Sequence, residues 1–165
     1  MSEPSLLYLI FKTLHVLSAI VFLGNITTGL LWKRRADRTR DVRIVRHVAE
    51  GIIVADRRFT IPGVIGLVVF GFGAAGVGGL PLLRTGWILW AVVLFILSGV
   101  VFMAGLVPIQ RRLAAVAASG EQAGTMDWGA YERLSRAWDA WGAVALLAPV
   151  LAAILMIFKP ALPAL

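Results

Sequence analysis

The sequence predicts an all-α integral membrane protein, a bundle of four transmembrane helices with both termini on the extracytoplasmic side. Hydrophobic residues make up 59% of the 165 residues, whereas soluble domains are about half apolar. The charged residues gather in clusters, and the apolar stretches between them reach the roughly 20 residues that a helix needs to cross a bilayer. The chain has no cysteine, which excludes disulfides, thiolate metal sites and thiol catalysis.

Four apolar segments have this length, at about residues 5–32, 61–83, 86–108 and 138–158. We interpret residues 1–165 as a single domain of four spans. Pro62 would fall in the first turn of the second span, where proline is tolerated. Asp127 is expected to cap a helix that leads into the fourth span.

A further helix is predicted between the first two spans. Residues 41–55 place Val45, Val48, Ile52 and Ala55 at helical spacing, which predicts a short amphipathic helix lying on the cytoplasmic face of the membrane. His47 belongs to this segment and is expected to be an exposed surface histidine.

The positive charges predict the orientation. The stretch between the first two spans carries Lys33, Arg34, Arg35, Arg38, Arg40, Arg43, Arg46, Arg57 and Arg58. The stretch before the fourth span carries Arg111, Arg112, Arg133 and Arg136, whereas the second loop has only Arg84 and the tail only Lys159. Positive residues favour the cytoplasm, so both termini are expected outside.

The same charges indicate the surroundings of the chain. The net charge is +7, and a basic surface beside spanning helices points to anionic lipid headgroups as its partner rather than to nucleic acid. The excess of arginine over lysine suggests a GC-rich bacterium. We therefore expect the protein to be a multi-pass protein of the bacterial cytoplasmic (inner) membrane.

The second span is rich in glycine, with Gly63, Gly66, Gly71, Gly73, Gly76, Gly78 and Gly79. Residues 71–76, "GFGAAG", match a dinucleotide-binding pattern, but that pattern works only where a strand turns into a helix. Inside an apolar span, glycines instead let another helix, or a flat cofactor, approach the backbone closely.

The polar residues of the first span fall on one stripe. Helical spacing aligns His15, Ser18 and Asn25, and Lys12 lies one turn from His15 on the same side. Ionisable groups inside a bilayer are costly and usually face the interior of a bundle. The other spans carry no ionisable residue near their centres, which argues against an ion or proton pathway.

Two interpretations of His15 stand side by side. A lone neutral imidazole in an apolar bundle suits a haem iron, and Lys12 would then pair with a propionate near the outer surface. Alternatively, His15 bonds to a neighbouring helix and Lys12 extends outward to the interface. No second histidine is available within the membrane, so a bis-histidine site within one chain is not expected.

Residues 8–37, "YLIFKTLHVLSAIVFLGNITTGLLWKRRAD", resemble the opening helix of the HemJ-type protoporphyrinogen oxidases and of a related group of small, uncharacterised bacterial integral membrane proteins. Residues 56–63, "DRRFTIPG", resemble the start of the second span in the uncharacterised group. Residues 85–90, "TGWILW", are similar to the start of the third span, and residues 155–160, "LMIFKP", to the shared ending. The resemblance covers most of the chain.

This resemblance implies a four-helix haem b protein, in a family that oxidises protoporphyrinogen to protoporphyrin, with His15 at the position of the family histidine. The family also has an essential lysine early in the third span, shortly after a Gly-Trp pair. Here Gly86 and Trp87 are followed by no lysine through Ala91, and Phe22 and Leu23 stand where the family has a tryptophan. The sequence therefore fits the uncharacterised group better than the oxidases.

The sequence thus predicts a haem-b-binding membrane protein with an electron-transfer or porphyrin-related redox role. His15 is the expected metal ligand, with Lys12, Ser18 and Asn25 beside the cofactor, and no catalytic residue is assigned. Two alternatives remain. The chain could be a non-catalytic accessory subunit that packs its glycine-rich face, Trp138 and Trp141 against a larger complex or another copy of itself, or it could be a small-molecule transporter.

Overall fold

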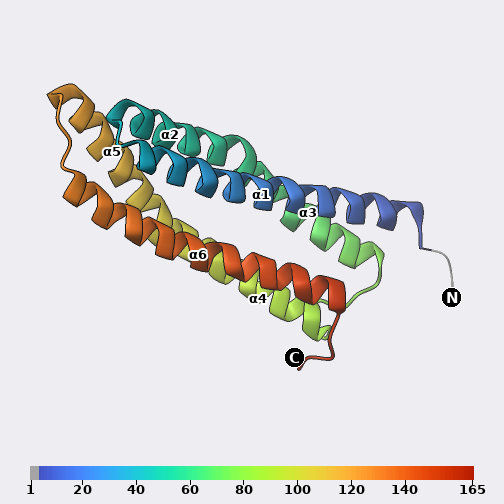
Figure 1. The fold of residues 1–165 in the computed structure, drawn as a ribbon. Helices are drawn as coiled ribbons and strands as arrows, with labels where there is room; N and C mark the ends of the chain where they lie inside the picture. Colours follow the sequence, from blue (N-terminus) through green and yellow to red (C-terminus); the bar gives the residue numbers. More distant parts are fainter. Residues whose placement is uncertain (1–3) are drawn as a thin grey trace.

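The computed structural model describes residues 4–165, and every regular element in this range is a helix (Figure 1). In chain order the elements are α1 (Leu6–Thr39), α2 (Val42–Ala55), η1 (Asp56–Thr60), α3 (Ile61–Val77), α4 (Gly86–Val101), η2 (Phe102–Leu106), α5 (Val107–Ala123) and α6 (Trp128–Phe158). The elements η1 and η2 are π-helical turns, and each joins its two neighbouring helices into one.

The chain therefore forms four long helices, which confirms the predicted all-α membrane architecture. Each is long and apolar enough to cross a membrane, and their bounds are Leu6–Thr39, Val42–Val77, Gly86–Ala123 and Trp128–Phe158. The shortest has 31 residues, or roughly 45 Å at a rise of about 1.5 Å per residue. All four thus exceed the hydrocarbon layer, which is about 30 Å thick.

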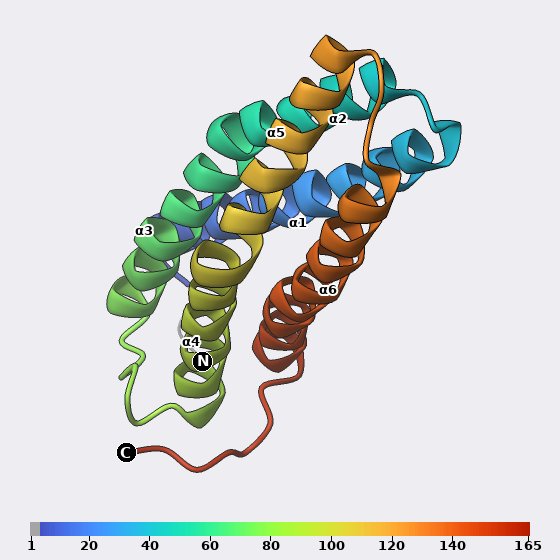
Figure 2. The same cartoon turned by 90° about the vertical axis from the view of Figure 1, so that its left-hand side faces the viewer.

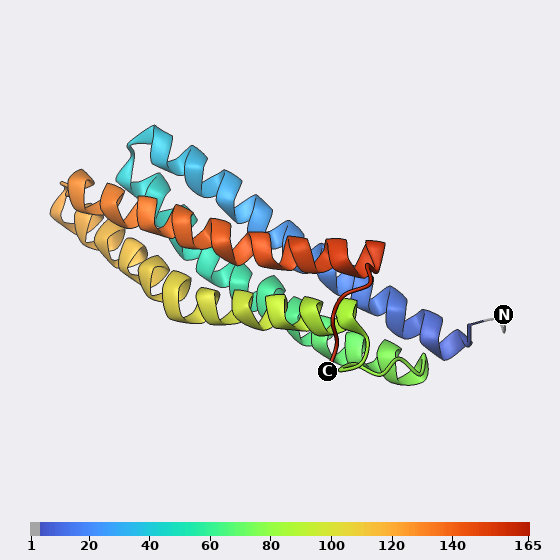
Figure 3. The same ribbon diagram turned by 90° about the horizontal axis from the view of Figure 1, so that it is seen from below.

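The bundle consists of two helix pairs. Helix α1 packs along α3, and α4 packs along α6 (Figures 1 and 3). The start of α1, the C-terminus and the connection from α3 to α4 lie at one end, and α2 and α5 pack together at the other (Figures 1 and 2). Within residues 4–165, α3 and α4 have no Cα atoms within 8 Å of each other, so the two pairs join mainly at the α2–α5 end.

Burial follows the same division. The buried apolar core lies at the α2–α5 end and consists of Ala36, Val45, Leu106, Leu113, Ala117, Met126, Tyr131 and Trp138. Elsewhere, many large apolar side chains are open, among them Ile20 on α1, Ile65 on α3 and Ile96 on α4, each about 60% exposed. Side chains of this kind need apolar surroundings, and in a membrane protein the lipid supplies them.

Each π-helical turn ends two residues before a proline, because Pro62 and Pro108 are the second residues of α3 and α5. A proline inside a helix lacks an N–H, and its ring clashes with the carbonyl four residues back. Ile61 N–H instead donates to the carbonyl of Asp56, five residues back, and Val107 makes the equivalent bond in η2. The wider turn lets each helix continue past its proline.

Two stretches differ from the sequence-based expectation. The first span was expected to end near Trp32, but α1 continues to Thr39. Residues 41–55 were expected to lie flat on the membrane as a separate helix; they are helical, but α2 runs without a break into the second span. The reason is that the apolar side of α2 packs against α1 and α5, which leaves Val45 only 1% exposed.

Aspartate side chains cap the two helices that begin at the arginine-rich end, α2 and α6. Asp41 accepts hydrogen bonds from the backbone N–H groups of Arg43 and Ile44 at the start of α2. Asp127 caps α6, as predicted, by accepting from the N–H of Ala130 at 2.9 Å. Such caps satisfy backbone donors that have no partner within the helix.

Candidate functional site

The predicted stripe of α1 faces α3. His15 Nδ1 lies 2.9 Å from the backbone carbonyl oxygen of Leu67, and the side chains of Ser18 and Phe22 contact α3 at Gly66 and Gly63. These contacts follow from the spacing of the residues, since positions three and four apart share one face of a helix.

The glycines of α3 make this close contact feasible. A Cβ atom on Gly71 would lie 2.8 Å from His15 Nδ1, and one on Gly73 would lie 2.7 Å from the ring of Phe11. Real Cβ atoms essentially never come so close. The glycine-rich face therefore packs against α1, which was one of the two uses that the sequence predicted for it.

The contact with Leu67 defines the chemistry of His15. A carbonyl oxygen only accepts hydrogen bonds, so Nδ1 carries a ring proton, and it is the neutral form of the ring in which Nε2 has a free lone pair. Within residues 4–165 no hydrogen-bond partner lies at Nε2, and this atom is not among the buried polar atoms that lack one. The half-buried imidazole can therefore use Nε2 as a ligand atom.

The other predicted residues lie in different surroundings. Lys12 is exposed, and its ammonium nitrogen stands 5.9 Å from the centre of the Tyr8 ring. The hydroxyl of Ser18 donates to the carbonyl of Leu14 on its own helix, at 2.8 Å. Asn25 lies ten residues beyond His15, which is about 15 Å along α1. Lys12 and His15 are thus neighbours on α1, whereas Asn25 is too far along the helix to share a site with His15.

Asn25 belongs to a polar group that also includes Asp56, Thr60 and Gln110. Asn25 Nδ2 donates to Thr60 Oγ1 at 2.9 Å and to Asp56 Oδ1 at 3.3 Å, and the Thr60 hydroxyl donates to the same carboxylate oxygen at 2.8 Å. Gln110 Nε2 donates to Asp56 Oδ2 at 3.0 Å. Thr60 and Gln110 are buried, so the group ties α1, η1 and α5 together.

Three of these four residues line a cavity of about 250 Å³ between α1, α2, α5, α6 and the two π-helical turns. Its other walls are mostly apolar. Sequence reasoning missed Asp56 and Gln110 as site residues. The available signal was that Asp56 is an acidic residue inside an arginine-rich stretch and directly before an apolar span.

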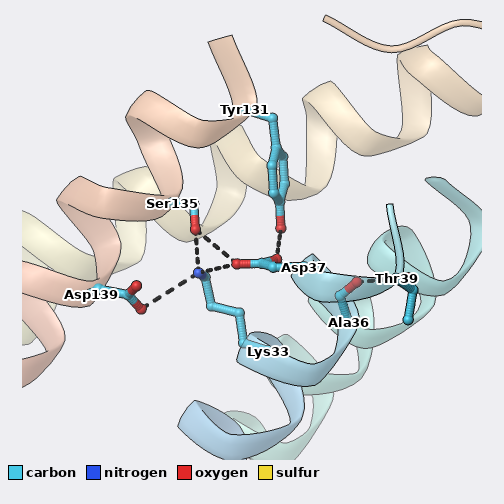
Figure 4. Close-up of polar contacts among 7 residues, drawn as sticks. All are labelled: Lys33, Ala36, Asp37, Thr39, Tyr131, Ser135 and Asp139. Carbon is cyan, nitrogen blue, oxygen red and sulfur yellow. Dashed lines mark hydrogen bonds and ion pairs between the residues drawn. The ribbon is translucent and has the colours of Figure 1, made fainter. Parts of the chain in front are cut away.

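A second polar group centres on Lys33 (Figure 4). Its ammonium donates to Asp37 Oδ2 at 2.8 Å and to Ser135 Oγ at 2.5 Å, and it lies 3.5 Å from Asp139 Oδ1. The hydroxyls of Tyr131 and Ser135 donate to Asp37 at 2.6 and 2.8 Å. Sequence reasoning had treated Lys33 as a loop charge, whereas its side chain is buried on α1.

No group of three or more histidine and acidic side chains in the described part of the chain is arranged to hold a metal ion. His15 stands alone on α1, and His47 is an exposed residue at the edge of the cavity. A metal ion at His15 would therefore receive one donor atom from this chain and would need the others from a bound organic ligand.

The chain matches the family described as "Predicted integral membrane protein (DUF2269)" over residues 9–160, and it belongs to that family. No curated protein and no solved structure matches it.

Proposed function

We propose that this integral membrane protein binds haem b through His15 and serves in electron transfer or porphyrin-related redox chemistry. The supporting observation is the hydrogen bond between His15 Nδ1 and the Leu67 carbonyl. Metal-binding histidines almost always donate their second ring N–H to a carbonyl, a carboxylate or water, which fixes the tautomer and the orientation of the ring.

The donor set of the chain is compatible with haem. A haem macrocycle brings four nitrogen ligands of its own, so a single imidazole from the protein would be enough to hold it. When bound, haem b supplies one-electron chemistry at its iron. His15 Nε2 would hold the haem iron, and the exposed ammonium of Lys12, one turn away, would pair with a propionate.

Ser18 and Asn25 contribute less to this proposal. The Ser18 hydroxyl is bound to its own helix and Asn25 to Asp56 and Thr60. The haem proposal therefore rests on Lys12 and His15, and on the resemblance of residues 8–37 to the opening helix of the HemJ-type oxidases. The absence of a lysine after Gly86 and Trp87 leads us to propose a redox role other than protoporphyrinogen oxidation.

We further propose that the protein resides in the bacterial cytoplasmic membrane with both termini outside. The α2–α5 end carries the arginine-rich stretches and is therefore the end that we place in the cytoplasm. His15 then lies nearer the outer half of the bilayer.

The test is an absorption spectrum of the purified protein, recorded reduced minus oxidised. We expect a Soret band that is absent in His15→Ala and present in His47→Ala, which removes the exposed histidine outside the α1–α3 contact. In His15→Gly, added imidazole should restore the band, and this rescue separates loss of a ligand from loss of the fold. A wild-type protein without a Soret band, made in cells supplied with haem precursor, would overturn the proposal.

A further inference from the structure

The cavity beside Asn25 has the features of a binding site that is separate from His15. Its volume is about 250 Å³, near the lower end of the range of roughly 300–1,000 Å³ that is usual for ligand pockets. Residues from several helices that are distant in sequence converge on it, and both π-helical turns contribute to its wall through Asp56, Phe102 and Leu106. Such turns often occur at functional sites.

No cationic side chain in the described part of the chain forms an ion pair with Asp56. Within residues 4–165, five acidic side chains form ion pairs, namely Asp37, Glu50, Glu121, Glu132 and Asp139. Two others, Asp41 and Asp127, cap helices. Asp56 does neither, and no lysine or arginine lines the cavity. A partly buried carboxylate in this position lacks a counter-charge.

The hydrogen bonds around Asp56 leave it able to accept another. A carboxylate offers about four acceptor positions, and Asn25, Thr60 and Gln110 fill three of them. Because the carboxylate can only accept, the amide nitrogens of Asn25 and Gln110 must point toward it, and their amide oxygens point elsewhere. Neither oxygen has a partner in the described part of the chain, and neither is a buried atom without one.

The one charged carboxylate on the wall is therefore Asp56, with the amide side chains of Asn25 and Gln110 beside it. Thr28, His47 and Trp138 are also on the wall, and the Trp138 indole N–H is buried without a hydrogen-bond partner among the described residues. The rest of the wall is apolar and includes the aromatic rings of Trp32, Phe102 and Trp138, which attract cations through their faces. A metal cation such as Ca²⁺ or Mg²⁺ needs about six oxygen ligands, which this wall does not supply. An organic cation needs only one or two acceptors and gains from the apolar wall.

We propose that the cavity binds a small organic cation, an amine or quaternary ammonium with an apolar body, with its charged group at Asp56. The proposal does not depend on haem binding at His15, which lies outside the cavity. Tryptophan side chains in the wall give an intrinsic signal, because a ligand that enters changes their fluorescence.

The test uses the purified protein in detergent and phenyltrimethylammonium as the probe, followed by calorimetry and tryptophan fluorescence. The neutral comparison is tert-butylbenzene, which has the same shape without the charge, corrected for its uptake by empty micelles. We expect saturable binding of the cation and at least roughly tenfold weaker binding of the neutral molecule, because only the cation carries a charge to set against the Asp56 carboxylate. Equal binding of both molecules would overturn the proposal.

Two variants test the position. Asp56→Asn should weaken binding roughly tenfold or more, whereas Asp127→Asn removes the same charge far from the cavity, keeps a good helix cap and should bind like the wild type. If Asp56→Asn fails to fold, Gly51→Leu decides. Gly51 lines the cavity, and a Cβ there meets no atom within 4 Å, so the larger side chain should block binding without disturbing the fold. Undiminished binding in a folded Gly51→Leu protein would contradict the assignment.

Discussion

Lys33 Nζ on α1 lies 2.5 Å from Ser135 Oγ on α6, and this hydrogen bond joins the two helix pairs of the bundle. The same ammonium contacts a carboxylate on each side, Asp37 of its own helix and Asp139 of α6. The ring of Trp138 lies 5.0 Å from the ammonium. Helices α1 and α6 approach each other at few points in the described part of the chain, and this contact is one of them.

Replacing Lys33 tests how strongly this link stabilises the bundle. Lys33→Met keeps the length of the side chain and removes the charge, which leaves Asp37 and Asp139 without a cation. Breaking a fully buried ion pair costs about 3–5 kcal/mol. Because both carboxylates are partly exposed, we expect Lys33→Met to lose less than this, about 2 kcal/mol. The loss should appear as a decrease of the melting temperature in detergent. Arg34→Met is the matched control, since Arg34 is exposed. Equal melting temperatures in the two variants would contradict the prediction.

The contact between Gly71 and His15 predicts a position-specific effect of alanine. A methyl group at Gly71 would lie 2.8 Å from His15 Nδ1, so Gly71→Ala should displace the imidazole from Leu67. Overpacking of this kind costs about 1–3 kcal/mol. On the same helix, a Cβ at Gly76 meets no atom within 4 Å, so Gly76→Ala should be neutral or stabilising by up to about 1 kcal/mol. Thermal unfolding of both variants measures these changes. A Gly71→Ala protein as stable as the wild type would contradict the prediction.

The orientation can be tested at the C-terminus. A reporter that fluoresces only in the cytoplasm, fused after Leu165, should stay dark, because we place the basic α2–α5 end inside and the C-terminus lies at the other end of the bundle (Figure 1). The same reporter placed between α5 and α6, after Gly124, should be bright. A bright fusion at Leu165 would reverse the assigned orientation.

The absence of a lysine shortly after Gly86 and Trp87 predicts the result of a complementation experiment. Oxidising protoporphyrinogen removes six electrons and six protons, so the site needs proton acceptors beside a redox centre. Lys12 and His15 offer at most two such groups, and a haem-bound His15 could not act freely as a base. We expect that the chain will not rescue a strain that lacks its own protoporphyrinogen oxidase.

Adding a lysine in the third span should not restore that activity. Trp90 Nε1 donates to the Pro163 carbonyl at 3.1 Å, and Ala91 is 2% exposed. Trp90→Lys would therefore remove a hydrogen bond, and Ala91→Lys would place a charge at a buried position. Growth of the complemented strain without added haem, lost again in His15→Ala, would contradict this prediction and show that the chain oxidises protoporphyrinogen.

Periodicity and length alone predicted the membrane architecture. Four apolar stretches of spanning length mark the four helices, because the hydropathy of a segment is a local property that needs no knowledge of its neighbours. The stripe on α1 was predicted for the same reason, since helical spacing places His15, Ser18 and Asn25 on one face whatever they contact. The close approach at the glycines also followed from the residues themselves.

The tertiary structure decided which partner each polar side chain meets. Lys33 and Ser135 are 102 residues apart, and Asp56 and Gln110 are 54 apart. Lys33 sits next to two arginines, so in the sequence it looks like a cytoplasmic loop charge, and only the continuation of α1 against α6 buries it. Likewise, α2 is amphipathic whether it lies on lipid or on α5. Such choices depend on the packing and register of helices that are far apart in the chain, and no local pattern of residues encodes them.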